Sequence, residues 1–165
     1  MVNSNENLKK ICSFYVSDWH LVTMLIPYLK EKLAMGANIS TILEKSLEEN
    51  INTLMEKLVI NINEKNKITA INWKENKNCT EEEIKNKLNK VDNEEQIIII
   101  VGNKEYINKM NNYIEKNIKK NVTIINCFEA TQFNESVKEI LDKHKYILNT
   151  SGEKNIEDVF EMYVS

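Results

Sequence analysis

Apolar and polar positions follow two different rhythms along the chain. Short apolar runs bounded by turn residues predict strands, whereas apolar positions that repeat every three or four residues predict amphipathic helices. The first rhythm predicts strands over residues 11–16, 38–43, 68–73, 96–101 and 122–127, with a further short candidate at 146–148. The second predicts a helix that begins at Thr80 and helices over 18–35, 47–59, 103–119, 134–143 and 156–163. The polar stretch 61–67 predicts a loop.

The order of these elements predicts the fold class. Strands and helices alternate with short connections, which is typical of crossover units around a parallel sheet. The run of isoleucines and a valine at 97–101 lacks polar alternation, as expected for a strand buried on both faces. We therefore predict an α/β fold: a three-layer sandwich with a mostly parallel five- or six-stranded sheet and helices on both faces. Residues 1–10 would form a polar N-terminal segment, and 11–165 a single α/β domain.

The composition narrows the range of partners. The chain has 165 residues, of which 42% are hydrophobic and 28% charged, and its formal net charge is −3. That balance does not provide the basic face that nucleic-acid binding usually needs. All 22 basic side chains are lysine, so bidentate guanidinium clamps on phosphate are excluded. The heavy use of Asn, Ile and Lys is typical of an A/T-rich bacterial genome.

Cysteine usage and the length of the apolar runs indicate the cellular compartment of the protein. The three cysteines, Cys12, Cys79 and Cys127, have no C-x-x-C spacing, which fits a reducing cytoplasm better than a disulfide scaffold or a zinc knuckle. The polar N-terminus has no apolar signal core, and no run approaches the roughly 18 apolar residues of a membrane span. We expect a cytoplasmic protein that binds neither nucleic acid nor membranes.

Familiar phosphate and metal motifs are missing from the sequence. A P-loop and a dinucleotide-binding loop both need clustered glycines, whereas this chain has three isolated ones, Gly36, Gly102 and Gly152. The only histidines, His20 and His144, are far apart in sequence, and we expect His144 at a solvated helix end. No cofactor and no metal are predicted.

Ligands of an open parallel sheet gather beyond the carboxyl ends of its strands, and this rule selects a candidate site. Both tryptophans follow predicted strands, so Trp19, His20 and Trp73 would form one aromatic wall of a pocket. The plainer interpretation is that Ser17 or Asp18 caps a helix and that the aromatic residues only pack. The predicted ligand-binding residues are Tyr15, Asp18, Trp19, His20, Trp73, Gly102 and Asn103.

Nucleophilic catalysis has one weak candidate. Cys127 ends a predicted strand and could approach His20 across the sheet, which would give a cysteine–histidine pair. A buried cysteine at a strand end is more often a packing residue. We therefore predict no catalytic residues.

The segment "ICSFYVSDWHLVTMLIPYLKEKLAMGANISTILEK" resembles the start of the MEDS domain, a sensory domain of methanogen and methylotroph regulators and some histidine kinases. The shared features are a strand ending in Tyr15, the polar turn Ser17-Asp18, a helix over 21–35, Gly36, and an apolar strand over 39–43. The resemblance implies a relative of the RecA/KaiC ATPases that lacks a working phosphate loop. It carries over no catalytic residue.

Three functions remain open from the sequence. The first is a non-catalytic sensory or regulatory domain that binds a small ligand or a protein partner at the strand ends, its output passing to a kinase, a transcriptional regulator or a second copy of the chain. The second is an enzyme of small-molecule metabolism, with acid–base chemistry from Asp18, His20, Glu75 or Glu129. The third is a pure interaction module.

Overall fold

The isoleucine run forms strand β3 (Gln96–Val101), and all six of its residues are buried. Alternate side chains enter two separate hydrophobic cores: Ile97, Ile99 and Val101 enter one, and Ile98 and Ile100 enter the other. A strand with a core on each face must lie inside a sheet that is covered on both sides. The prediction of a doubly buried strand is confirmed, with the predicted bounds.

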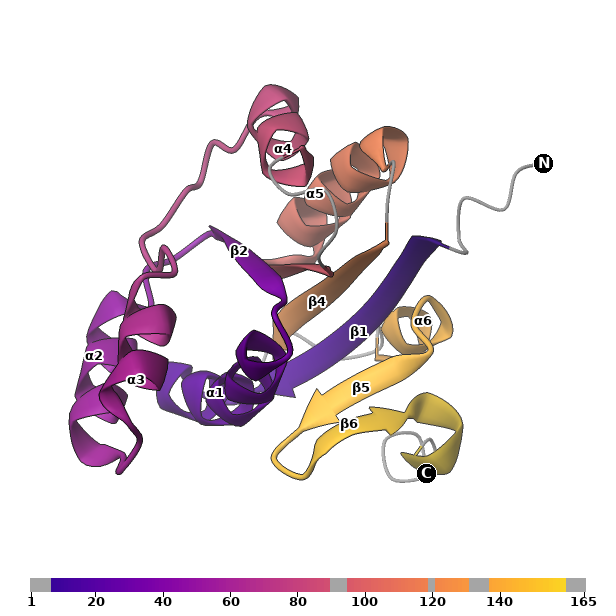
Figure 1. Ribbon diagram of the computed structural model, residues 1–165. Helices are drawn as coiled ribbons and strands as arrows, with labels where there is room; N and C mark the ends of the chain where they lie inside the picture. The colour runs from indigo at the N-terminus through magenta and orange to yellow at the C-terminus, as the bar shows by residue number, and fades with distance from the viewer. Residues whose placement is uncertain (1–6, 90–94, 119–120, 131–136, 160–165) are drawn as a thin grey trace.

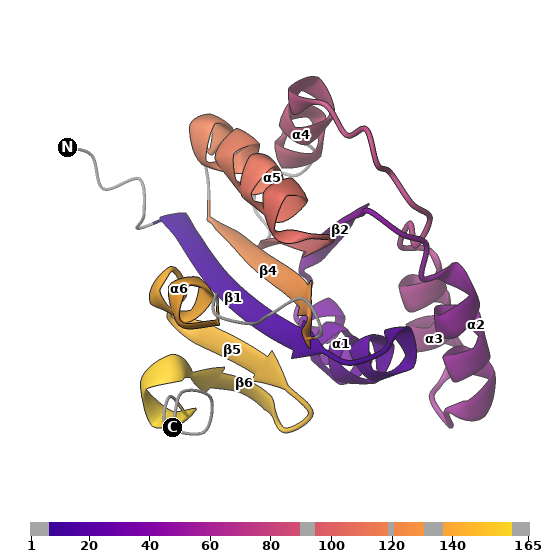
Figure 2. The ribbon, with the colours of Figure 1, turned by 180° about the vertical axis from the view of Figure 1, so that it is seen from behind.

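The computed structural model describes residues 7–89, 95–118, 121–130 and 137–159 (Figures 1 and 2). Its sheet has six strands in the order β2-β3-β4-β1-β5-β6. All neighbours are parallel except β5 and β6, which form an antiparallel pair. Besides β3, the strands are β1 (Leu8–Tyr15), β2 (Asn38–Leu43), β4 (Val122–Glu129), β5 (Tyr146–Asn149) and β6 (Gly152–Asn155).

Helices cover both faces of the sheet, which confirms the predicted three-layer fold (Figures 1 and 2). One core contains the buried residues of α1 (Asp18–Ala34), α2 (Glu48–Lys57) and α3 (Ile62–Thr69). The other contains those of α4 (Glu81–Leu88), α5 (Lys104–Asn117) and α6 (Val137–Asp142). No helix in the described ranges is both long enough and apolar enough to cross a bilayer.

The region between α2 and α4 differs from the prediction. Residues 61–67 are largely helical rather than a loop, because Asn61 caps α3 by accepting a hydrogen bond from the backbone N–H of Glu64 at 2.8 Å. The strand predicted over 68–73 is wrong: Ile68 and Thr69 end α3, and an irregular segment follows. Trp73 folds back so that its indole N–H donates to the carbonyl of Ile68 at 2.9 Å. The apolar letters of this run reflect core packing rather than strand pairing.

The first strand and the last elements of the chain also differ from the prediction. Strand β1 begins at Leu8, inside residues 1–10, which we predicted to form a polar segment before the domain. Its first residues pair with β4 from Val122 onward. Strand β6 was not predicted, since its sequence GEKN has no apolar alternation. The helix predicted over 156–163 is present at 156–159, and its remainder lies outside the described residues, as do 134–136 of the helix predicted before it.

Candidate functional site

The carboxyl edge of the sheet, where we expected the ligand, holds a compact polar cluster. Tyr15 ends β1, Asp18 begins α1, and Lys45 follows β2. The Lys45 ammonium lies 2.5 Å from the Asp18 carboxylate and 4.9 Å from the centre of the Tyr15 ring. Burial raises the pKa of Tyr15 to about 12 even though Lys45 acts in the opposite direction. Two of the predicted residues, Tyr15 and Asp18, therefore meet through a lysine that the prediction did not include.

A second cluster forms where β3 leads into α5. The Asn103 side chain caps the helix by accepting from the Tyr106 backbone N–H at 2.8 Å. The Glu44 carboxylate accepts from the Asn103 N–H, also at 2.8 Å. A helix start of this kind attracts anions, and here the chain's own carboxylate occupies it. Gly102 is required because a Cβ there would lie 2.7 Å from the Tyr106 ring and 2.8 Å from Glu44 Oε1.

The turn between β1 and α1 is mainly a helix start. Ser17 is the N-cap, and its hydroxyl accepts from the His20 backbone N–H at 3.0 Å. The His20 ring turns back and accepts from the Val16 N–H through Nδ1, also at 3.0 Å. Trp19 is 38% exposed, with the Lys57 ammonium 5.3 Å from its ring centre. The capping interpretation is confirmed for Ser17.

Trp73 does not stand at the rim with Trp19. It is only 3% exposed and belongs to the core on the α1 side of the sheet. Neither tryptophan is among the residues that line the cavities discussed in the following paragraphs. The expected aromatic wall of Trp19, His20 and Trp73 is therefore not assembled, because the strand that was to present Trp73 is not formed.

Cys127 forms no pair with His20. The thiol is fully buried, and its sulfur lies 3.9 Å from the carbonyl oxygen of Ile125. Burial raises the pKa of the Cys127 thiol, so it is held in the inert protonated form. Within the described ranges no group of three His, Cys, Asp or Glu side chains could hold a metal ion.

The opposite, amino edge of the sheet has a notch that arises from strand register. Strand β1 pairs with β4 from Leu8 onward, but its described ladder with β5 begins only at Ile11, opposite Tyr146. The overhang leaves a cavity of about 520 Å³ between β1, the end of α5 and the segment that leads from α6 into β5. We call this cavity the lysine notch. Its lining residues are Leu8, Lys9, Lys10, Glu115, Lys143, Lys145 and Tyr146.

The lysine notch is strongly basic although the whole chain is acidic. Four lysines and one glutamate line it, whereas the formal net charge of the chain is −3. In the described part of the chain, Lys10 and Lys145 form no ion pair. Burial lowers the pKa of Lys10, and the nearby Lys143 lowers it further against the opposing effect of Glu115. An anion in the notch would relieve that repulsion.

A buried polar network lies beside the notch, between α5, β4 and α6. Asn111 and Asn126 exchange two side-chain hydrogen bonds of 2.8 and 3.1 Å, and His144 lies 2.9 Å from the Asn126 amide. His144 is 8% exposed, so the expected solvated helix end is wrong. His144 lies just after α6, and its ring meets the Phe128 ring edge-on, with 6.3 Å between the ring centres. Burial lowers its pKa to about 4.

Sequence reasoning did not find the notch residues or this network. The lysines of the notch come from two segments far apart in sequence, and 22 lysines spread along the chain give no local signal for any of them. The one usable signal is Asn126, a polar residue inside the apolar run of β4, because a buried amide needs a buried partner.

No family model matches the chain, and neither a curated protein nor a solved structure matches it.

Proposed function

We propose that the protein is a non-catalytic ligand-binding domain with a regulatory role, whose ligand is a small anion bearing phosphate or carboxylate groups held in the lysine notch. The observation that carries the proposal is the concentration of four lysines around a 520 Å³ cavity in an acidic chain. A cavity of this volume suits a small molecule. Lysine binds phosphate as a point charge and needs no guanidinium fork.

The charge distribution supports an anion over other ligands. A concave surface lined by one sign of charge focuses its field and attracts the opposite charge. Lys9 is held by Glu153 at 2.7 Å and Lys143 lies 3.9 Å from Glu139, so these two are partly neutralised. Lys10 and Lys145 keep their charge for a ligand. Removing either one should therefore weaken anion binding more than removing an exposed lysine elsewhere.

An enzymatic role has less support among the described residues. Asp18 is paired with Lys45, and the exposed Glu75 lies 3.5 Å from Lys77. Neither lines the lysine notch. The resemblance of the first segment to MEDS domains agrees with a sensory role and forms part of this proposal.

The test is isothermal titration with inorganic phosphate, pyrophosphate and citrate at constant ionic strength. We expect saturable binding of at least one of these anions, with affinity at least about 10-fold lower in Lys10→Gln and in Lys145→Gln, since a charge-assisted hydrogen bond contributes about 1.5–3 kcal/mol. Lys85→Gln is the matched control, because Lys85 is exposed on α4 and lies outside the notch. Equal affinity in the wild type and both notch variants would refute the proposal. Turnover of a bound phosphate ester would refute its non-catalytic part.

A second candidate function is protein docking at the carboxyl edge, favoured by two exposed apolar side chains. Val16 is 63% exposed and stands close in sequence to the exposed Trp19. A kinase, a transcriptional regulator or a second copy of the chain would cover them. Sedimentation of the wild type and of Val16→Ser tests whether a second copy of the chain binds at this edge. A wild-type dimer that dissociates in Val16→Ser would support this binding. A wild type that stays monomeric at all concentrations would contradict it.

A further inference from the structure

A small internal cavity lies next to the lysine notch, between β1, β4, α5 and α6. Its volume is about 10 Å³, roughly the room that one water molecule needs. We call it the histidine cavity, because His144 is among its lining residues. Lys10 and Lys143 line both the histidine cavity and the notch. The same two ammonium groups therefore border the proposed anion site and the surroundings of the buried imidazole.

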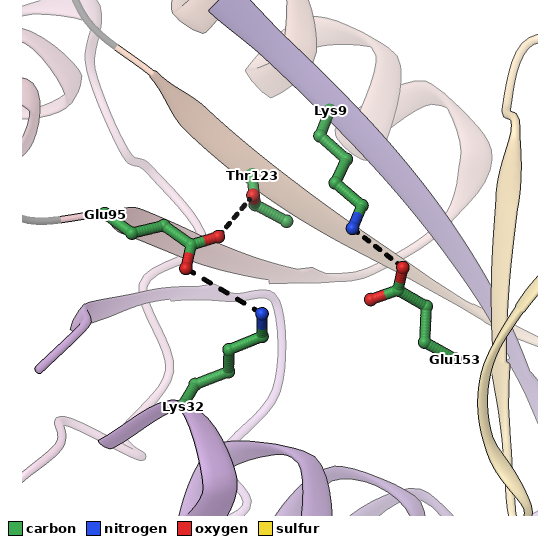
Figure 3. A network of polar contacts seen from close by, with 5 residues as sticks. All are labelled: Lys9, Lys32, Glu95, Thr123 and Glu153. Atoms are coloured by element: carbon green, nitrogen blue, oxygen red, sulfur yellow. Dashed lines mark hydrogen bonds and ion pairs between the residues drawn. The ribbon is translucent and has the colours of Figure 1, made fainter. Parts of the chain in front are cut away.

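The direction of the β1 side chains decides which notch lysines act on His144. Successive side chains of a strand point to opposite faces of the sheet, and Lys10 lies on the face that the α5 core covers. Lys9 lies on the other face, where its ammonium is 2.7 Å from the Glu153 carboxylate (Figure 3). Because Lys9 is paired and lies across the sheet, Lys10 and Lys143 are the notch lysines that bear on the imidazole.

More positive than negative charge lines the histidine cavity. Lys10 comes from β1, Lys104 from α5, and Lys143 directly precedes His144 in the chain. Among the described lining residues, Glu139 on α6 is the one acidic side chain, and β4 contributes only uncharged ones. The Glu139 carboxylate lies 3.1 Å from the Lys104 ammonium and 3.9 Å from that of Lys143. A single carboxylate therefore balances three ammonium groups, and the imidazole lies in a positive field.

This field makes protonation of His144 harder. Burial is the largest cause of its lowered pKa, and Lys10 and Lys143 lower that pKa further, against the hydrogen bond between the ring and the Ile140 carbonyl. An anion beside the same two ammonium groups would offset their repulsion of the imidazolium. Conversely, an imidazolium would add a positive charge next to the notch and strengthen its attraction for an anion.

We propose that anion binding in the lysine notch and protonation of His144 are coupled, so that each favours the other and the notch holds its anion more tightly in acid. The coupling rests on the proposed function of the notch and adds a regulation of that site by protons. Coupling between two sites is reciprocal: the factor by which the anion raises the proton affinity of His144 is the factor by which the proton raises the anion affinity.

The first experiment follows the imidazole signals of the full chain by NMR from neutral pH to about pH 4. It is run without added anion and with saturating sulfate, phosphate, pyrophosphate or citrate at constant ionic strength. Sulfate keeps its charge throughout this range, so its own titration cannot imitate the coupling. We expect a bound anion to raise the His144 midpoint by about one pH unit, as a unit charge roughly 10 Å away does inside a protein. His20, the only other histidine, lies at the opposite edge of the sheet and is the internal reference.

A lysine variant tests the link between the two cavities without any anion. Lys10→Gln removes one of the two ammonium groups, so we expect the His144 midpoint to rise in the anion-free protein. Lys85→Gln is the matched control, because Lys85 is exposed on α4 and lines neither cavity. An anion-free His144 midpoint that is the same in Lys10→Gln and in the wild type would overturn the coupling.

The second experiment measures the affinity for the same four anions in the wild type and in His144→Gln. Between neutral pH and pH 4.5 we expect the wild-type affinity to grow about 3-fold more than that of His144→Gln, which is the gain that a one-unit rise from about pH 4 implies. Glu115 in the notch also loses charge in acid, as some of the anions do, but both proteins share these changes. If His144→Gln does not fold, the NMR titration of the wild type decides alone.

The outcomes separate the coupling from the proposed function. An anion that binds, with an affinity that Lys145→Gln lowers, but leaves the His144 midpoint in place would overturn the coupling and leave the proposed function standing. Equal growth of affinity in the wild type and His144→Gln would do the same. No saturable binding of any of the four anions would refute both.

Discussion

Asn126 on β4 donates a side-chain hydrogen bond to Nε2 of His144 across 2.9 Å of the core. The direction of this bond follows from the other ring nitrogen, which lies 2.7 Å from the carbonyl oxygen of Ile140. A carbonyl can only accept, so Nδ1 carries the proton and Nε2 must accept. The protonated imidazolium, with two donors, would face the Asn126 amide donor with no acceptor. The site is therefore built for neutral histidine.

This relationship predicts a pH-dependent stability. The pKa of His144 falls from an ordinary 6.5 to about 4 because burial disfavours the charged ring, with Lys10 and Lys143 adding repulsion. Between those values the unfolded chain binds a proton that the folded protein excludes, so stability is complete above pH 6.5 and falls as the pH drops toward 4. The loss amounts to about 3 kcal/mol. The urea midpoints of the wild type and His144→Gln should differ at pH 7 and become similar near pH 4. The same difference at every pH would contradict the lowered pKa of His144.

The Asn111–Asn126 pair should behave as one unit. Asn111→Leu removes the donor to the buried Asn126 side-chain oxygen, and we expect a loss of about 1–3 kcal/mol in the free energy of unfolding. Asn126→Leu also removes the donor to His144 and should cost more. A double-mutant cycle checks the coupling, because two residues in one network lose less together than separately. Additive losses would show that the two amides act independently.

Gly102→Ala should destabilise the fold by about 1–3 kcal/mol, as expected when extra volume is forced into a tight site. The added methyl would lie 2.7 Å from the Tyr106 ring and 2.8 Å from Glu44 Oε1. Glu44→Ala clears one of these atoms, so the same glycine substitution should cost less in that background. Thermal unfolding of the four proteins measures the difference, and an equal cost in both backgrounds would argue against the steric cause.

Ser17→Ala should lower the free energy of unfolding by about 1 kcal/mol, since it removes the hydroxyl that accepts the His20 N–H at the start of α1. Ser17→Asp keeps an acceptor at the N-cap and should retain most of the stability. Chemical denaturation of the three proteins at pH 7 makes the comparison. If aspartate proves as damaging as alanine, the cap does not act through its acceptor oxygen.

The strands with a clear apolar signal could be predicted from the sequence, and their bounds show why. Strands β2 and β3 have the predicted limits, because their apolar runs end at the polar pair Glu44-Lys45 and at Gly102-Asn103. The run at 68–73 also contains apolar residues but forms the end of α3 and an irregular segment, in which only Ile68 and Trp73 are buried. Short apolar runs alone do not separate a strand from core-facing irregular chain. The Trp73 indole bonds the Ile68 carbonyl only five residues away, and both side chains belong to the core on the α1 side of the sheet. Burial in that core, and no pairing with another strand, accounts for the apolar residues of this run.

The candidate site could be predicted only where it follows directly from strand ends. The rule that points to the carboxyl edge selected Tyr15 and Asp18, which both contact Lys45 in the structure, but Lys45 itself was not selected. The lysine notch depends on a three-residue offset between the starts of two neighbouring ladders on β1. Register between strands far apart in sequence is set by the assembled core, so no window of the sequence contains it.

Both edges of the sheet are closed to further strands. At one edge β6 is four residues long and carries Glu153 and Lys154. At the other, the irregular segment around Asn72 and Asn76 lies along β2, where Asn72 accepts from the Thr41 hydroxyl and the Asn76 N–H donates to Leu43. Short, charged or covered edges prevent edge-to-edge pairing. A chain with a run of four isoleucines is thereby protected from cross-β aggregation as long as it stays folded.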